Sequence, residues 1–450
     1  MPVKNRPSTP EPAGPEPPAP ASDRAVVGGK TDAATWLFGA AMVGLCLAVV
    51  VIGTTLGMRL EQAGLLSTNS WLFGYDSKRV VADISVPGAN DRSNVHPLFV
   101  VFFKPPSLWL QRHGMRGTMT AILFTAMAIG LTVVLFGYYG RARGLPCWES
   151  FLLAALLAVS ATGAVTGVVI GTRAYAMLSI SVLILMGAVS LRVELDPKAS
   201  RIKIAFREVG WLAAGIVAYG ITISNGLQAF IHYLAGHLGR RVVLRAMIYG
   251  AVVLGLGLAA STFSGAIMEW TRELWVVTPA ERGGSLEHPG PRLLANFLLF
   301  SIVAPLQNLR PTPISGLEGQ WVLIFNDWNF SPLGWLLCAF WIVLLVWGVI
   351  AAWRDPEPGG RRLSAALAVC FVYNMVFHYF YYVPFEGTWL YTPNTVASLV
   401  GLLVPLFARM GQGAAPRRWI WRGVMVIFIG LLGWRHYQML HGIPELFRGL

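Results

Sequence analysis

The stretch 33–58, AATWLFGAAMVGLCLAVVVIGTTLGM, runs for 26 residues without a charged side chain. About 20 consecutive apolar residues suffice for a helix to cross the hydrocarbon core of a bilayer. The run is also longer than the apolar core of a cleavable signal peptide. It therefore predicts a membrane-spanning helix, and the pattern recurs along the chain.

The composition agrees with this interpretation over all 450 residues. Hydrophobic residues make up 55% of the chain, charged residues only 13%, and the mean hydropathy is +0.57. A soluble domain carries about 25% charged residues. The composition excludes a soluble enzyme, a disordered protein and a fibrous protein, and it predicts an all-α, polytopic integral membrane protein.

The positive charge is concentrated in five short loops. They hold 17 Lys and Arg against 6 Asp and Glu, an excess of eleven, where the whole chain has a net charge of +13. An excess of Lys and Arg is typical of cytoplasmic loops of membrane proteins. We therefore expect no nucleic-acid partner, and we place these loops on the inner side: 138–150, 191–210, 237–246, 353–363 and 408–422.

Uncharged runs give about eleven spans, with the N-terminus cytoplasmic and the C-terminus outside. The run 209–239 is too long for one span, so we divide it at 224–226, where a Ser-Asn-Gly sequence favours a break. Residues 1–33 are Pro-rich and predict a disordered cytoplasmic tail, followed by one transmembrane domain over 34–450. The expected location is a bacterial inner membrane. The spans are 33–58, 117–140, 150–172, 174–191, the two halves of 209–239, 246–268, 328–353, 363–385, 387–408 and the weaker 419–434.

Two outer loops are large, 59–115 and 265–332. The first contains Asp76, Arg79 and Asp83, spaced three and four residues apart, which would share one face of a helix. In the second, the apolar stretch 293–305 is expected to lie at the interface or pack on the bundle, because a further span would invert the basic loops after it.

Such a set of charges suits sugar transfer from a lipid phosphate. A carboxylate can accept the proton of the attacking hydroxyl, and cations or a metal ion can stabilise the departing phosphate. Lys78, Arg79, Lys104 and Arg173 are the outer-face cations. The alternative interpretation is that these charges only solvate the loop and anchor it at lipid headgroups.

Several motifs, in this order, resemble GT-C superfamily glycosyltransferases, which take sugars from polyprenyl-phosphate donors at the outer face. Together they cover roughly 34–410. They are the loop 71–84, His96-Pro97-Leu98-Phe99, the inner turn 144–150, Thr172-Arg173-Ala174-Tyr175, the sequence 220–225, and the late segments 374–378 and 385–391.

The resemblance implies an inverting transfer to an acceptor whose identity stays open. Asp76 matches the catalytic position, and Asp83 is its partner. The two could also hold a divalent metal, Mg or Mn. Arg173 departs from the pattern, because many relatives have an acidic residue there; it is expected to contact the donor phosphate or to leave the carboxylate pair incomplete. The residues expected to bind the lipid-linked sugar are Lys78, Arg79, His96, Lys104, Arg173, His378, Glu386 and Tyr391.

Other interpretations remain open. His96 precedes a proline at a predicted helix start, where a structural role competes with lining the site. His378 and Glu386 lie in an aromatic belt that interface anchoring alone can explain. At the level of the whole chain, the alternatives are a transporter or lipid flippase, a non-catalytic scaffold, and an enzyme resembling O-antigen ligases. The last would act through Arg272, Arg282, His288 and Arg292 of the second outer loop.

Overall fold

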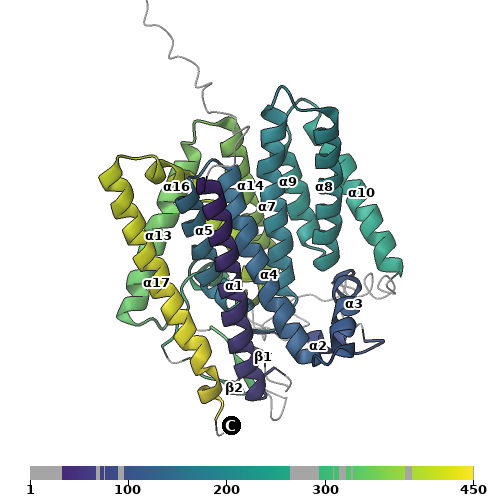
Figure 1. Ribbon diagram of the computed structural model, residues 1–450, viewed down its shortest axis with the longest axis vertical. Helices are drawn as coiled ribbons and strands as arrows, with labels where there is room; N and C mark the ends of the chain where they lie inside the picture. Colours follow the sequence, from purple (N-terminus) through teal and green to yellow (C-terminus); the bar gives the residue numbers. More distant parts are fainter. Residues whose placement is uncertain are drawn as a thin grey trace, which may run out of the picture.

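The computed structural model describes residues 33–66, 71–75, 77–89, 96–263, 293–307, 309–313, 321–325, 328–380 and 388–448. Within them the chain is mostly α-helical, as predicted (Figure 1). The first half contains α1 (Ala33–Gln62), α2 (Ser77–Ser85), α3 (Phe99–Arg112), α4 (Gly117–Ala142), α5 (Cys147–Val159), α6 (Ala161–Thr166), α7 (Arg173–Leu195), α8 (Arg201–Ile221), α9 (Asn225–Gly236) and α10 (Val242–Phe263). The second half contains the π-helical turn η1 (Asn296–Phe300), α13 (Pro332–Trp353), α14 (Pro358–Phe380), the 3-10 helix η2 (Thr388–Asn394), α15 (Val396–Gly401), α16 (Val404–Gly411) and α17 (Ala415–Leu446).

Six helices of the described chain are long and apolar enough to cross a membrane: α1, α4, α7, α8, α10 and α13. Their outward faces carry large apolar side chains in the open, such as Trp36, Leu336 and Trp347. A soluble protein would bury such surfaces, so the chain is built as a membrane protein. The expected total of about eleven spans is not established by these helices.

Two of the predicted spans are broken helices rather than continuous ones. Residues 150–172 form α5 and α6 on either side of Ser160, which is extended. The Ser160 hydroxyl accepts a hydrogen bond from the Gly163 N–H and caps α6. The backbone N–H groups of Ala161 and Thr162 donate to Ile302 and Ser301. Residues 387–408 are likewise divided among η2, α15 and α16. The predicted division of the run 209–239 is confirmed, but the break lies at 222–224 rather than at 224–226: α8 ends at Ile221, and Asn225 and Gly226 already belong to α9.

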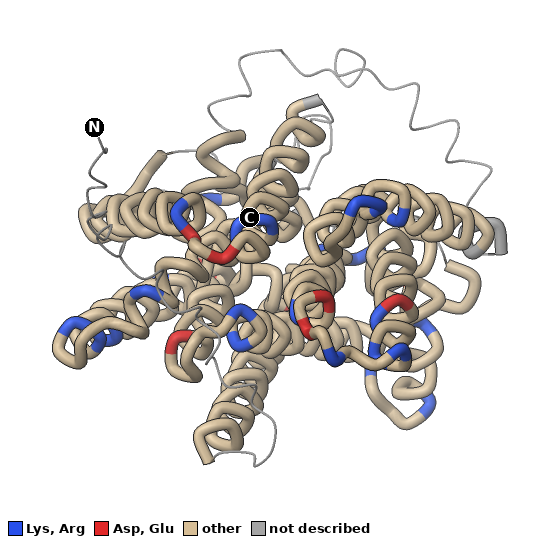
Figure 2. The backbone as a smooth tube through the Cα atoms, turned by 90° about the horizontal axis from the view of Figure 1, so that it is seen from above, with Lys and Arg blue, Asp and Glu red and all other residues tan. Residues whose placement is uncertain are grey.

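The basic loops gather at one end of the bundle, called here the basic end, at the top of Figure 1. Arg143 forms an ion pair with Asp355 at 3.2 Å, and Arg422 forms one with buried Glu149 at 2.8 Å. Arg362 donates to the Leu234 carbonyl at the end of α9. Seen along the bundle in Figure 2, Lys and Arg lie at many helix ends and Asp and Glu at few. The loops grouped from their charge therefore do share one face.

The opposite end, called the sheet end, joins parts of both large loops (Figure 1). Strand β1 (Trp71–Leu72) pairs in parallel with β3 (Trp321–Leu323), which pairs antiparallel with β2 (Thr312–Pro313). Helices α2 and α3 lie at this end, and so does the end of α17, where Glu445 is 3.9 Å from Arg59 of α1.

The apolar stretch 293–304 packs inside the bundle, as expected for a segment that does not span. Phe297, Ile302 and Ala304 are fully buried. Helix α17 holds this segment through His436, whose Nε2 accepts from the Ala304 N–H at 3.1 Å while Nδ1–H donates to the Val159 carbonyl at 2.7 Å. One imidazole thereby joins α17, the break after α5 and the buried segment.

Candidate functional site

The first outer loop is seated on the bundle at the turn between α6 and α7. The Tyr75 ring lies against Gly171, where an added Cβ would overlap the ring. The Tyr75 hydroxyl hydrogen-bonds to Thr166 Oγ1 at 2.9 Å, and the Ser77 hydroxyl donates to the Ile170 carbonyl. Burial raises the pKa of the Tyr75 phenol, and both the Thr166 hydrogen bond and the positive charge of Arg173 act against that rise.

His96 fixes the far end of the same loop. Its Nδ1–H donates to the Ile221 carbonyl at 2.6 Å, and its Nε2 lies 3.2 Å from the Thr172 hydroxyl. The Leu98 N–H donates to Gly220. The last carbonyls of α8 have no partner within their helix, so the loop caps them. The structure thus brings together three motifs that are far apart in sequence, and it supports the structural role for His96.

Arg79 and Asp83 of the loop lie on helix α2, whereas Asp76 lies outside the described residues. Asp83 is buried on α2, Arg79 is partly buried one turn before it, and Lys78 is exposed. Lys104 of α3 donates to the Ala89 carbonyl. Desolvation lowers the pKa of Lys104, and the negative charge of Asp83 opposes that shift. Asp83 of α2 and Lys104 of α3 are therefore close enough to interact electrostatically.

A column of stacked side chains lies at the sheet end between α7, η2 and α14. The Arg173 guanidinium lies 4.6 Å from the centre of the Tyr391 ring. His378 stacks on Tyr391 with ring centres 3.8 Å apart, and Phe297 lies 6.0 Å from His378. Arg173, His378 and Tyr391, which the resemblance had named separately, are thus neighbours.

Within the described residues, Arg173 has no ion-pair partner and His378 has no hydrogen-bond partner. Among the described residues, no carboxylate forms an ion pair with Arg173, which is only partly buried. His378 is 2% exposed, and in that same part of the chain neither of its ring nitrogens has a hydrogen-bond partner. A cation and an unpaired imidazole in an apolar bundle are costly unless a ligand or water meets them. The column can therefore bind an anion.

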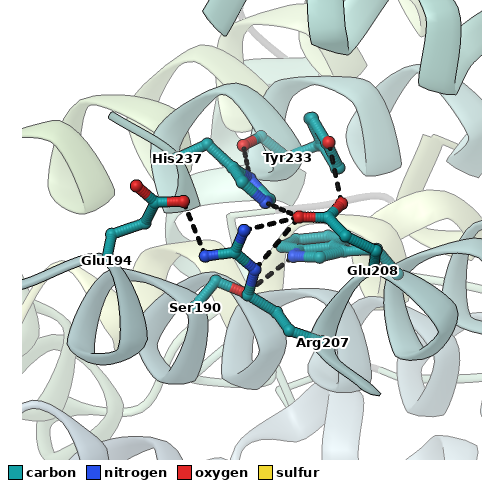
Figure 3. Close-up of polar contacts among 7 residues, drawn as sticks. Ser190, Glu194, Arg207, Glu208, Tyr233 and His237 are labelled. Atoms are coloured by element: carbon teal, nitrogen blue, oxygen red, sulfur yellow. Dashed lines mark hydrogen bonds and ion pairs between the residues drawn. The ribbon is translucent and has the colours of Figure 1, made fainter. Parts of the chain in front are cut away.

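A second polar cluster, which the sequence had not indicated, lies at the basic end (Figure 3). Arg207 contacts Glu194 at 2.6 Å and Glu208 at 2.5 Å. Glu208 also accepts from the Tyr233 hydroxyl at 3.0 Å and lies 3.2 Å from Nε2 of buried His237. The cluster joins α7, α8 and α9, and each side chain has partners. We assign it to holding these helices together.

The sequence analysis placed its candidate site in the loop 59–115, where acidic residues are concentrated, and did not identify the cluster around Arg207. A signal was present, because Arg207 and Glu208 lie directly before the apolar run 209–239. Ionisable groups beside a span are usually paired with a neighbouring helix. Asn374 and Asn394 are uncharged, so no comparable sequence pattern points to them.

One of the two proposed metal ligands lies outside the described residues. Asp76 and Glu386 lie outside the described residues, as do Arg272, Arg282, His288 and Arg292 of the alternative site. Within the described ranges no group of three His, Cys, Asp or Glu side chains is arranged to hold a metal ion. Comparison with protein-family models, curated proteins and solved structures gave no match for the chain.

Proposed function

We propose that the protein transfers a monosaccharide from a polyprenyl phosphate to an acceptor at the outer face of a bacterial inner membrane. The observation that carries the proposal is Arg173, a guanidinium at the sheet end with no carboxylate partner in the described chain. Arginine binds phosphate well because its planar donors match phosphate oxygens. The phosphate of a membrane lipid would approach Arg173 at the sheet end from the bilayer.

The transfer is a single displacement. The acceptor oxygen attacks the anomeric carbon, the carbon–oxygen bond to phosphate breaks, and the configuration inverts. Asp76 takes the acceptor proton. Arg173 stabilises the charge that the leaving polyprenyl phosphate gains. Asp83, whose negative charge acts on Lys104 of α3, is the second carboxylate of the proposed site.

The test is sugar release from a panel of labelled polyprenyl-phosphate sugars by purified protein in lipid discs. Membrane extract supplies the acceptor. We expect turnover of at least one donor by the wild type and a fall of about 100-fold or more in Arg173→Gln, as for loss of an oxyanion-stabilising group. Asp76→Asn should lose transfer while it keeps donor binding.

Arg112→Gln is the matched control, because Arg112 is an exposed arginine in α3 at the same end. Its rate should stay close to that of the wild type. Failure of the wild type to turn over any donor, or full activity in folded Arg173→Gln, would contradict the proposal.

A transporter or lipid flippase is the second candidate, because the two broken helices favour it. Interrupted helices near mid-bundle are common at transporter binding sites, and Thr162 at the start of α6 donates to Thr392 of η2 at 2.8 Å. Movement of a labelled lipid across the disc bilayer without sugar release would select this function.

A further inference from the structure

A stripe of buried, uncharged polar side chains continues inward from His378. It contains Gln228 of α9, Asn374 of α14, Asn394 at the end of η2 and Ser398 of α15, all of them 0% exposed. Each has at least one polar side-chain atom with no hydrogen-bond partner among the described residues. Buried polar atoms are nearly always paired in folded proteins. This concentration around one place therefore requires an explanation.

The packing of the helices brings the stripe together. The Asn374 amide donates to the Cys370 carbonyl at 2.8 Å and lies 3.5 Å from the Asn394 carbonyl oxygen. Asn374 and His378 are four residues apart on α14, about 6 Å along its axis. Ser398 follows Asn394 by four residues. Helix α14 packs against both η2 and α15, so the unpaired polar atoms of these three elements lie in the same part of the bundle.

Helix α9 supplies the opposite wall. It runs antiparallel to α14, because Cys370 contacts His232 at 3.7 Å and the Tyr373 hydroxyl donates to the Ser224 carbonyl at 3.2 Å. Gln228 lies midway between Ser224 and His232. One turn along each helix from the contact between His232 and Cys370 are Gln228 and Asn374, so the two lie at a similar level of the antiparallel pair.

The chemistry of the stripe is selective. Amides, a hydroxyl and an imidazole both donate and accept hydrogen bonds, which suits the hydroxyl groups of a sugar. The stripe itself contains no carboxylate, ammonium or guanidinium. A sugar carboxylate would be buried without a cation other than Arg173, and a sugar ammonium would be buried without an anion; both are unfavourable.

We infer that this stripe is the sugar subsite and that it takes an uncharged monosaccharide whose hydroxyls pair with Gln228, Asn374, His378, Asn394 and Ser398. The inference rests on the proposed function, since Arg173 at the end of the stripe would hold the phosphate to which the sugar is joined. It restricts the donor to neutral hexosyl or pentosyl lipids and excludes uronic acids and amino sugars with a free ammonium group.

The test measures access to single cysteines in a variant with the four native cysteines replaced, held in lipid discs. A small hydrophilic thiol reagent is applied to Asn394→Cys and Ser398→Cys. Leu399→Cys is the control. Leu399 is also buried on α15, but it is the apolar neighbour of Ser398 and not a member of the stripe. We expect both stripe cysteines to react at least tenfold faster than the control.

Protection by ligands then identifies the occupant. A polyprenyl phosphate bearing a neutral hexose or pentose should slow the reaction of Ser398→Cys at least tenfold. Bare polyprenyl phosphate, a uronosyl lipid and an aminosugar lipid should slow it less than threefold. Absence of labelling at both stripe positions, or equal protection by charged and neutral sugars, would overturn the inference.

The same samples separate this inference from the proposed function. Protection by a neutral sugar lipid without turnover by the wild type would retain the subsite and reject the transferase. Turnover without sugar-specific protection would retain the transferase and reject the subsite. Asn394→Leu adds a check that needs no cysteine: it should keep a folded protein and lose sugar-specific stabilisation against heat.

Discussion

Two glycines decide how the first outer loop meets the bundle. Gly171 leaves room for the Tyr75 ring, and Gly220 leaves room for Leu98, which also donates its N–H to the Gly220 carbonyl. Any larger side chain at either position would displace the loop that carries Asp76. Helix α2, which carries Arg79 and Asp83, directly follows Tyr75 and Asp76 in the chain and would shift as well.

Gly171→Ala should therefore destabilise the protein by about 1–3 kcal/mol, the usual cost of overfilling a packed site. Transfer activity should fall as well, because Tyr75 must move. Thermal unfolding in lipid discs measures the first effect and sugar release the second. Gly44→Ala, on α1 where an added Cβ meets nothing within 4 Å, should be neutral or slightly stabilising.

Equal stability of the two variants would show that Tyr75 is not seated as described. The double variant Gly171→Ala with Tyr75→Ala should lose less stability than the sum of the two single losses, because the ring that the added Cβ overlaps is gone. A purely additive result would argue against direct contact between these two residues.

At this scale the sequence indicated charged and aromatic candidates but not amides. Arg173, His378 and Tyr391 were named individually, and the structure stacks them together. Asn374 and Asn394 were not singled out as candidates for binding, because an uncharged amide inside an apolar run barely alters its hydropathy. Their importance appears only when helices remote in sequence bring them together.

Among the elements, α7, α8 and α9 depend on the cluster around Arg207. The Arg207 side chain is 4% exposed and contacts two carboxylates, while Glu208 is partly open to solvent. Removal of the cation would leave Glu194 and Glu208 close together without their shared partner. Loss of one partner from a buried ion pair is strongly destabilising.

Arg207→Met should lower the free energy of unfolding by about 3 kcal/mol, measured by denaturant titration in mixed micelles. Lys203→Met is the control on the same helix, because Lys203 is exposed and its ion pair with Asp196 is long, at 4.0 Å. That change should stay within about 0.5 kcal/mol. Similar losses in the two variants would show that the cluster does not hold the helices.

Hydropathy predicted the positions of the apolar segments but not which of them form one continuous helix and which are broken. The break after residue 221 had a local cause in Ser224-Asn225-Gly226 and was predicted. The break at Ser160 was not, because its freed backbone groups are met by Ile302 and Ser301, which are about 140 residues away. No local pattern contains that information.

For the whole molecule, the charge distribution predicts which end faces the cytoplasm. The structure groups the basic loops at one end and the sheet, α2 and α3 at the other. A membrane-impermeant thiol reagent applied to intact cells should label Val86→Cys, which is exposed at the sheet end. Lys198→Cys at the basic end should react only after the cells are permeabilised.

The reverse labelling pattern would place the candidate site in the cytoplasm and remove the outer-face function. Labelling of both positions in intact cells would instead indicate leaky cells, for which a cytosolic marker protein is the internal control. The native cysteines are replaced in both variants.

The contacts of His436 also constrain how the protein is made. Its imidazole joins the Val159 carbonyl and the Ala304 N–H, yet the ribosome delivers it about 130 residues after Ala304. At typical synthesis rates that delay is on the order of 10 s. During this time the Val159 carbonyl and the Ala304 N–H lack their hydrogen bonds to His436, and the interior of the bundle is exposed to the insertion machinery. Chains that stop before α17 should therefore be recognised as incomplete and degraded, even though nearly all of the candidate site has already been synthesised.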